Sequence, residues 1–273
     1  MRKQMTKRNW IIILLSILLF LSAAVLGVSS VYRVDEVTLY APVISQEAEE
    51  EAAAFKTRLL ETYKKRSTLF VKREEADAIS EEFPYLRIVS FKKSYPNRLV
   101  LEVREDAEVY AVPTSKSQEE YYILNADGVV LGVRKDSANR STGGHNVLLN
   151  GTDTLHIVGE KGSVLKGDET FQALLAFVKQ AHETLEGIQR NVLSVEVVRP
   201  AAATKETIFK VQTEEGVLLY VRNPLERTQE KATKAMQEYL NLGDDEKTSG
   251  ALLIYDVEQT LGVSYTREDI PLL

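Results

Sequence analysis

The chain has no cysteine, only three histidines and a single tryptophan among its 273 residues. The lack of cysteine excludes disulfides, a lipid-modified cysteine and every metal site with thiolate ligands. His145, His156 and His182 are far apart and lack partners at ligand spacing, which favours core or surface roles. A phosphate-binding loop, a Gly-x-Ser-x-Gly motif and a His-Glu-x-x-His motif are also absent. We therefore expect no enzyme activity, no cofactor, no metal site and no small-molecule substrate.

Beyond the first few residues, acidic residues outnumber basic ones. Four cations, Arg2, Lys3, Lys7 and Arg8, precede any acid, and without them 30 Lys and Arg face 40 Asp and Glu. This excess of acids argues against nucleic-acid binding and against a domain lying on anionic lipid. The hydrophobic fraction of 44% is enough for a buried core, and the remaining part of the chain suits one large or two small domains.

One long hydrophobic run is present, and it extends from Trp10 without a charge until Arg33. A helix of ~20 residues covers the ~30 Å core of a bilayer. The cations before the run, and the acids Asp35 and Glu36 after it, favour a cytoplasmic N-terminus. We expect a cytoplasmic tail at 1–9 and a transmembrane helix at 10–31, with the rest outside the cell. A cleaved signal peptide is the alternative, but its hydrophobic region would be shorter.

The pattern after the run predicts the order strand, helix, helix, strand, strand. A strand at 34–40 precedes a helix capped by Ser45, and a second helix occupies 72–82 before Pro84. Alternating residues at 86–95 and 98–104 flank the turn Pro96-Asn97, which is typical of an antiparallel hairpin. The apolar stripe of the first helix consists of Ala52, Phe55, Leu59 and Tyr63.

Strands dominate the later part of the chain, with helices interspersed. We expect a loop at 136–146, a helix capped by Asp168, and a helix that begins at Asn223-Pro224 and closes at Gly243. The expected strands are 109–113, 121–124, 129–133, 193–198, 208–213, 217–221, 251–257 and 261–265. The predicted fold class is α+β, with one transmembrane helix and a mixed α/β domain dominated by an antiparallel sheet.

A series of short motifs resembles the FtsQ/DivIB family of bacterial cell-division proteins. The motifs are Leu69-Phe70-Val71, Phe83-Pro84, Ser94-Tyr95-Pro96-Asn97-Arg98-Leu99, Glu102-Val103-Arg104-Glu105 and Tyr122-Ile123-Leu124-Asn125-Ala126-Asp127-Gly128. The resemblance implies a POTRA domain at 32–106, a β-domain at 107–257 and a C-terminal strand and tail at 258–273. The chain departs from the family at Tyr95, where tryptophan is common, and at Asn125, where aspartate is common.

The same resemblance implies a non-enzymatic divisome scaffold at the cell membrane, enriched at the division septum. Its partners would be small bitopic proteins of the FtsB/DivIC and FtsL type, which regulate septal peptidoglycan synthesis. The partner-binding edge would consist of Leu261, Gly262, Val263, Ser264 and Tyr265. Alternate strand residues share one face, so Val263 and Tyr265 would supply side-chain contacts, unless both are ordinary core residues.

The amino-acid sequence leaves two other functions open. A POTRA-bearing component of protein export or assembly normally adjoins a membrane β-barrel, and the chain does not end in strands of that type. A membrane-anchored cell-wall hydrolase or sensor is the second alternative, and a hydrolase would need a pair of carboxylates that no local motif marks.

Overall fold

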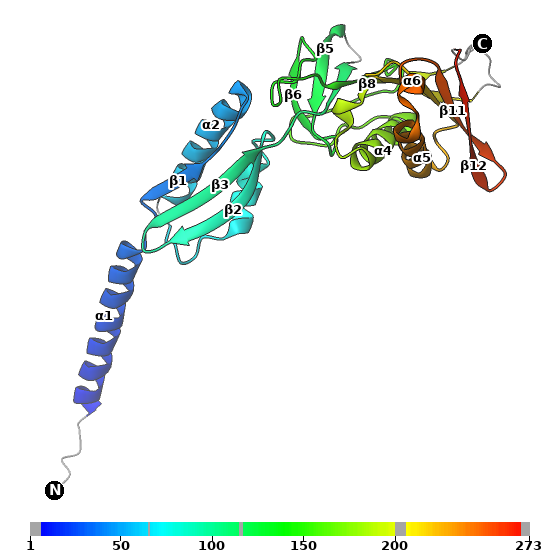
Figure 1. Cartoon of the computed structure of the whole chain (residues 1–273). Coiled ribbons are helices and arrows are strands. Elements are labelled where there is room, and N and C mark those ends of the chain that lie inside the picture. The colour runs from blue at the N-terminus through cyan, green and yellow to red at the C-terminus, as the bar shows by residue number, and fades with distance from the viewer. Residues whose placement is uncertain (1–6, 65, 115–116, 200–205, 269–273) are drawn as a thin grey trace. The chain divides into compact units, whose positions relative to one another are not determined.

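In the computed structural model, residues 7–64, 66–114, 117–199 and 206–268 are described (Figure 1). The chain divides into two compact units, Met1–Glu105 and Asp106–Leu273. The N-terminal unit contains helix α1 and a small three-stranded sheet, and the C-terminal unit contains a nine-stranded sheet. The chain is therefore α+β, with a large mixed sheet in its second unit.

Helix α1 covers Lys7–Val31, where the sequence predicted a transmembrane helix over 10–31. No helix among the described residues is long and apolar enough to cross a membrane, so that prediction is wrong. Most of the predicted tail, residues 1–6, lies outside the described residues.

The rest of the N-terminal unit has the predicted order strand, helix, helix, strand, strand. Its elements are β1 (Glu36–Tyr40), α2 (Gln46–Tyr63), α3 (Arg73–Ser80), β2 (Leu86–Ser94) and β3 (Arg98–Glu105). Strand β3 lies in the middle, antiparallel to β2 and parallel to β1. The predicted hairpin around Pro96-Asn97 is thus confirmed.

Helix α2 packs its predicted apolar stripe against this sheet. Phe55, Leu59 and Tyr63 are completely buried and contact a core that includes Leu99 and Leu101 of β3. Each such side chain contributes about 1.5–3 kcal/mol relative to exposure. The Oγ of Ser45 accepts the N–H of Ala48 at 3.2 Å, which confirms Ser45 as the helix cap.

The C-terminal unit contains a sheet with the strand order β12-β11-β10-β9-β8-β7-β4-β5-β6. Three neighbouring pairs, β4/β7, β7/β8 and β10/β11, are parallel, and the other five are antiparallel. Its strands are β4 (Tyr110–Thr114), β5 (Ser117–Leu124), β6 (Val130–Arg134), β7 (Val147–Asn150), β8 (Val192–Val198), β9 (Ile208–Thr213), β10 (Leu218–Arg222), β11 (Ala251–Val257) and β12 (Thr260–Thr266).

Two helices, α4 (Glu169–Thr184) and α5 (Thr228–Asn241), lie side by side on one face of this sheet (Figure 1). Phe177 of α4 and Met236 of α5 are completely buried in one core with Phe209, Val211 and Leu219 of the sheet. Two short helical turns, η1 (Ile188–Arg190) and α6 (Asp244–Lys247), connect elements. Alternate strand residues face the helices, which explains the period-two pattern of the sequence.

Three predictions for this unit need correction. Helix α5 begins at Thr228, because Asn223 and the N-cap residue Arg227 both have positive φ and interrupt a helical path from Asn223. Asn223 and Pro224 therefore precede the helix in a turn. Helix α5 ends at Asn241, with Leu242 as its C-cap, and Gly243 also caps α6, a turn that was not predicted. Strand β7 was also missed, since four residues give too short a pattern.

Candidate functional site: the edge of the C-terminal sheet

Strand β12 is the terminal strand of the nine-stranded sheet, and it contains all five predicted site residues, Leu261 to Tyr265. Its neighbour in the described part of the chain is β11, to which it is antiparallel (Figure 1). One row of its backbone groups therefore faces away from the sheet. An edge of this kind is a template for an added strand.

The geometry of the β11–β12 turn identifies which residues face outward. Val257 and Thr260 form the closing pair around a two-residue turn, and Glu258 in that turn has a φ of 50°. Hydrogen-bonded and non-hydrogen-bonded pairs alternate along an antiparallel ladder, beginning with the closing pair. The N–H and C=O groups of Leu261, Val263 and Tyr265 thus point away from β11.

The side chains of Val263 and Tyr265 turn toward the helix-covered face of the sheet. Both are partly buried and pack against the core of the C-terminal unit. The Tyr265 hydroxyl donates to the backbone carbonyl of Ser249 at 3.1 Å. These two side chains therefore stabilise the C-terminal unit itself. The outward backbone groups of β12 are more accessible to a partner than these side chains are.

The opposite face of β12 is shaped by Gly262 and Tyr255. A Cβ at position 262 would lie 2.7 Å from Cε2 and Cζ of Tyr255, so only glycine lets this ring lie over the strand. Tyr255 and Gly262 are direct partners in the ladder. An aromatic ring over a strand glycine stabilises an edge that would otherwise pack poorly. Ser264, on the same face, is exposed.

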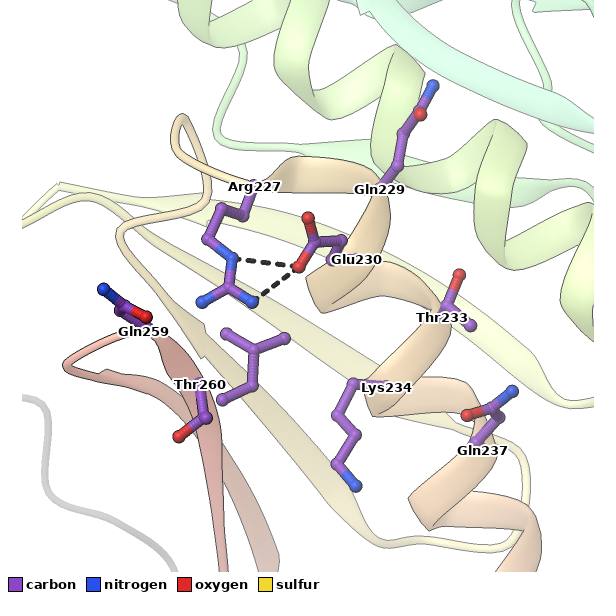
Figure 2. A pocket seen from close by; sticks show the side chains of 9 residues that line it. Arg227, Gln229, Glu230, Thr233, Lys234, Gln237, Gln259 and Thr260 are labelled. Carbon is purple, nitrogen blue, oxygen red and sulfur yellow. Dashed lines mark hydrogen bonds and ion pairs between the residues drawn. The ribbon is translucent and has the colours of Figure 1, made fainter.

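An open groove of about 570 Å³ lies between α5 and the β11–β12 hairpin (Figure 2). Glu230, Thr233, Lys234 and Gln237 line it from one face of α5, and Gln259, Thr260 and Leu261 line it from the hairpin. Figure 2 shows Arg227 directed toward Glu230, with Nη2 2.6 Å from Oε2. The groove was not predicted from the sequence, although the spacing of the α5 residues indicates one helical face.

A buried lysine holds the hairpin against α5. Lys231 is completely buried, and its Nζ donates to Oδ2 of Asp256 at 2.6 Å and to the carbonyl oxygens of Arg222 and Asn223 at 3.1 and 2.7 Å. All three protons of the ammonium are therefore satisfied. Asp256 lies in β11 opposite Leu261, so the lysine fixes the start of the edge strand relative to the groove.

The tyrosine and histidine side chains of the C-terminal unit are candidates for reactive or metal-binding groups. Burial, and then its hydrogen bond to Glu215, raises the pKa of the Tyr239 hydroxyl, which keeps Tyr239 neutral. His145 lies 3.3 Å from Glu214, His156 is exposed, and His182 lies in α4. Among the described residues, no group of three or more His, Asp or Glu side chains could hold a metal ion. The described part of this edge thus offers a backbone edge and a groove as a candidate binding surface.

Comparison with protein-family models and with curated proteins finds no match for the chain.

Proposed function

We propose that this chain is a non-enzymatic scaffold of the bacterial cell-division machinery. It would bind a small bitopic division protein, of the FtsB/DivIC or FtsL type, and so help couple division to septal peptidoglycan synthesis. The observation that carries the proposal is the edge strand β12, whose outward backbone groups at Leu261, Val263 and Tyr265 have no neighbouring strand in the described part of the chain. The family resemblance of the sequence motifs supplies the kind of partner.

The groove beside β12 supports binding of a segment longer than one strand. A partner strand paired with β12 would run alongside the groove face of α5, which presents Glu230 and Lys234. Because both signs of charge are present, a partner segment with mixed charges fits better than a uniformly acidic one. Backbone pairing would supply affinity, and side chains in the groove would supply register and choice of partner.

The proposed location is the outer side of the cell membrane at the division septum. Helix α1 exposes large apolar side chains, among them Trp10, Leu14, Leu19 and Phe20. Apolar surface of this extent is rarely left in contact with water by a protein. Association of α1 with lipid would bring both units to the place where other division proteins have their outer domains.

The decisive experiment removes one outward N–H from β12. Val263→Pro lacks this donor, while the inward hydrogen bonds of Thr260, Gly262 and Ser264 to β11 are kept, and edge strands tolerate proline. We expect loss of co-purification of the small division protein with the full chain. The matched control, Val263→Thr, changes the same side chain but keeps the N–H, and should retain the partner.

Two results would contradict the proposal. If Val263→Pro stays folded by circular dichroism and captures the partner as well as Val263→Thr does, pairing at this edge is wrong. Tyr265→Lys and truncation after Val257 are weaker tests, because Tyr265 also bonds Ser249 and the truncation removes a strand.

The cellular role has a separate test. A fluorescent fusion at the N-terminus should accumulate at midcell, and depletion of the protein should give filamentous cells. Uniform peripheral signal together with normal septation would exclude the division role, even if the edge of the sheet binds some other protein.

A further inference from the structure

Three segments of the N-terminal unit meet at one end, directly after α1. The N–H of Thr68 donates to the carbonyl of Tyr32 at 2.7 Å, and Nε of Arg33 donates to the carbonyl of Lys64 at 3.0 Å. Nζ of Lys93 donates to the carbonyl of Leu69 at 3.1 Å. The chain enters the unit here, because α1 ends at Val31. We call the surface formed by Arg33, Lys64, Leu69, Phe70, Lys93 and Tyr95 the α1-proximal surface.

This surface exposes apolar and aromatic side chains. Phe70 is 73% exposed, Tyr95 58% and Leu69 41%. The Tyr95 ring contacts the Tyr32 ring edge-on, with ring centroids 5.9 Å apart, and this contact stabilises the orientation of Tyr95. Neighbouring exposed residues of this size mark a site for an apolar partner.

Three cations belong to the same surface. Arg33 and Lys64 are exposed, and the Arg33 side chain bonds the main-chain carbonyl of Lys64. The bond from Lys93 to Leu69 places a third cation directly beside the apolar pair. Asp35 also lies at this end, where its Oδ2 accepts Nδ2 of Asn97 at 2.9 Å, but the three cations outnumber it and give the surface a local basic character. A surface that combines cations with aromatic and leucine side chains matches the composition of protein surfaces at a lipid–water interface.

We propose that the α1-proximal surface rests on anionic lipid. Phe70, Leu69 and the Tyr95 ring enter the headgroup layer, and Arg33, Lys64 and Lys93 contact phosphate groups. Two observations select lipid as the occupant: the charge complements anionic headgroups, and the surface continues directly from α1, whose apolar side chains are exposed. The surface would set the orientation of the N-terminal unit at the membrane. This inference rests on the proposed membrane location but is independent of the division partner.

The absence of cysteine permits a clean test with the full chain. Single-cysteine variants Phe70→Cys, Ile44→Cys and Leu19→Cys are labelled with nitrobenzoxadiazole and mixed with vesicles that carry a headgroup spin label. Ile44 is the matched control, because it is apolar and 78% exposed. Its backbone N–H donates to Oε2 of Glu105, at the end of β3 that lies away from the α1-proximal surface. Vesicles contain phosphatidylglycerol, or phosphatidylcholine alone.

We expect strong quenching at position 70 with phosphatidylglycerol, weaker quenching with phosphatidylcholine or high salt, and none at position 44. Replacing Arg33 and Lys64 by Gln should abolish the preference for phosphatidylglycerol. If position 19 is quenched while 70 behaves like 44, the inference is overturned and membrane association of α1 stands. If position 19 is also unquenched, the membrane location fails as well. Equal quenching at 70 in both vesicle types overturns the anionic preference.

Discussion

Both carboxylate oxygens of Glu108 accept hydrogen bonds from Arg134, at 3.0 Å from Nη1 and 2.8 Å from Nη2. Glu108 is completely buried, and Arg134 is nearly so. Glu108 also accepts the N–H of Arg140 at 3.0 Å, and its backbone carbonyl accepts Nδ2 of Asn139 at 2.7 Å. One buried acid therefore organises the loop at 136–146.

Substitution Glu108→Ala should cost about 3–5 kcal/mol of unfolding free energy, because it leaves the Arg134 guanidinium buried without its acid. Glu108→Gln should cost less, since an amide oxygen still accepts one of the two bonds. Urea denaturation of the full chain measures both. Glu120→Ala, an exposed acid on β5, is the control and should change stability by less than about 0.5 kcal/mol. Equal effects of Glu108→Ala and Glu120→Ala would show that the pair is energetically unimportant.

Removing Asp256 and removing Lys231 should cost the fold different amounts of unfolding free energy, although the two side chains form one ion pair. Asp256→Ala leaves a completely buried ammonium with only two carbonyl partners, and should cost about 3 kcal/mol. Lys231→Met removes the buried charge and leaves Asp256 partly in water, so it should cost clearly less. The double variant should be no less stable than Asp256→Ala. Urea denaturation of the three variants tests this, and a larger loss for Lys231→Met would contradict it.

The parts of the fold that were predictable depend on local periodicity. The stripe Phe55, Leu59 and Tyr63 specifies a helix face, and the alternation in 98–104 specifies a strand face, so both were confirmed. The start of α5 was not predictable. Asn223 and Pro224 have residue types suited to a helix N-terminus, but Asn223 and Arg227 both have positive φ, so the helix begins only at Thr228. Sequence patterns also contain no signal for the parallel pairing of β10 with β11.

The candidate site was predictable only as a segment. Hydrophobic alternation located a last strand at 261–265, but the edge position of β12 depends on the order of all nine strands. The outward direction of the Leu261, Val263 and Tyr265 backbone depends on the two-residue turn. The groove requires α5 to lie beside the hairpin, which rests on the buried Lys231. A single lysine in a helical pattern normally indicates a solvent-exposed position.

Two glycines with positive φ allow steric contact to be separated from backbone strain. Gly250 has a φ of +95°, and a Cβ there would lie 2.5 Å from the Thr266 carbonyl oxygen at the end of β12. Gly143 has a φ of +74° with no atom within 4 Å of a Cβ. Gly143→Ala should cost about 1–2 kcal/mol from backbone strain alone. Gly250→Ala should cost at least ~1 kcal/mol more, because backbone must move. Equal melting temperatures would contradict this.

His182 gives the fold a pH dependence of defined sign. Its imidazole is partly buried in α4, and Nδ1 accepts the N–H of Ile188 at 3.4 Å, which requires an unprotonated Nδ1. Burial lowers the pKa of His182 below its ordinary value of 6.5, although the charges of Glu183 and Asp127 oppose this. The unfolded chain therefore binds a proton at a higher pH than the folded chain does.

Stability from His182 should be fully present above pH 6.5 and should fall as the pH decreases through that value toward the lower folded pKa. His182→Gln keeps an acceptor for Ile188 but cannot titrate, so it should flatten the dependence of unfolding free energy on pH in this window. Urea denaturation of the parent chain and of His182→Gln at a series of pH values measures the slopes. If His182→Gln keeps the slope of the parent chain, protonation of His182 does not oppose folding.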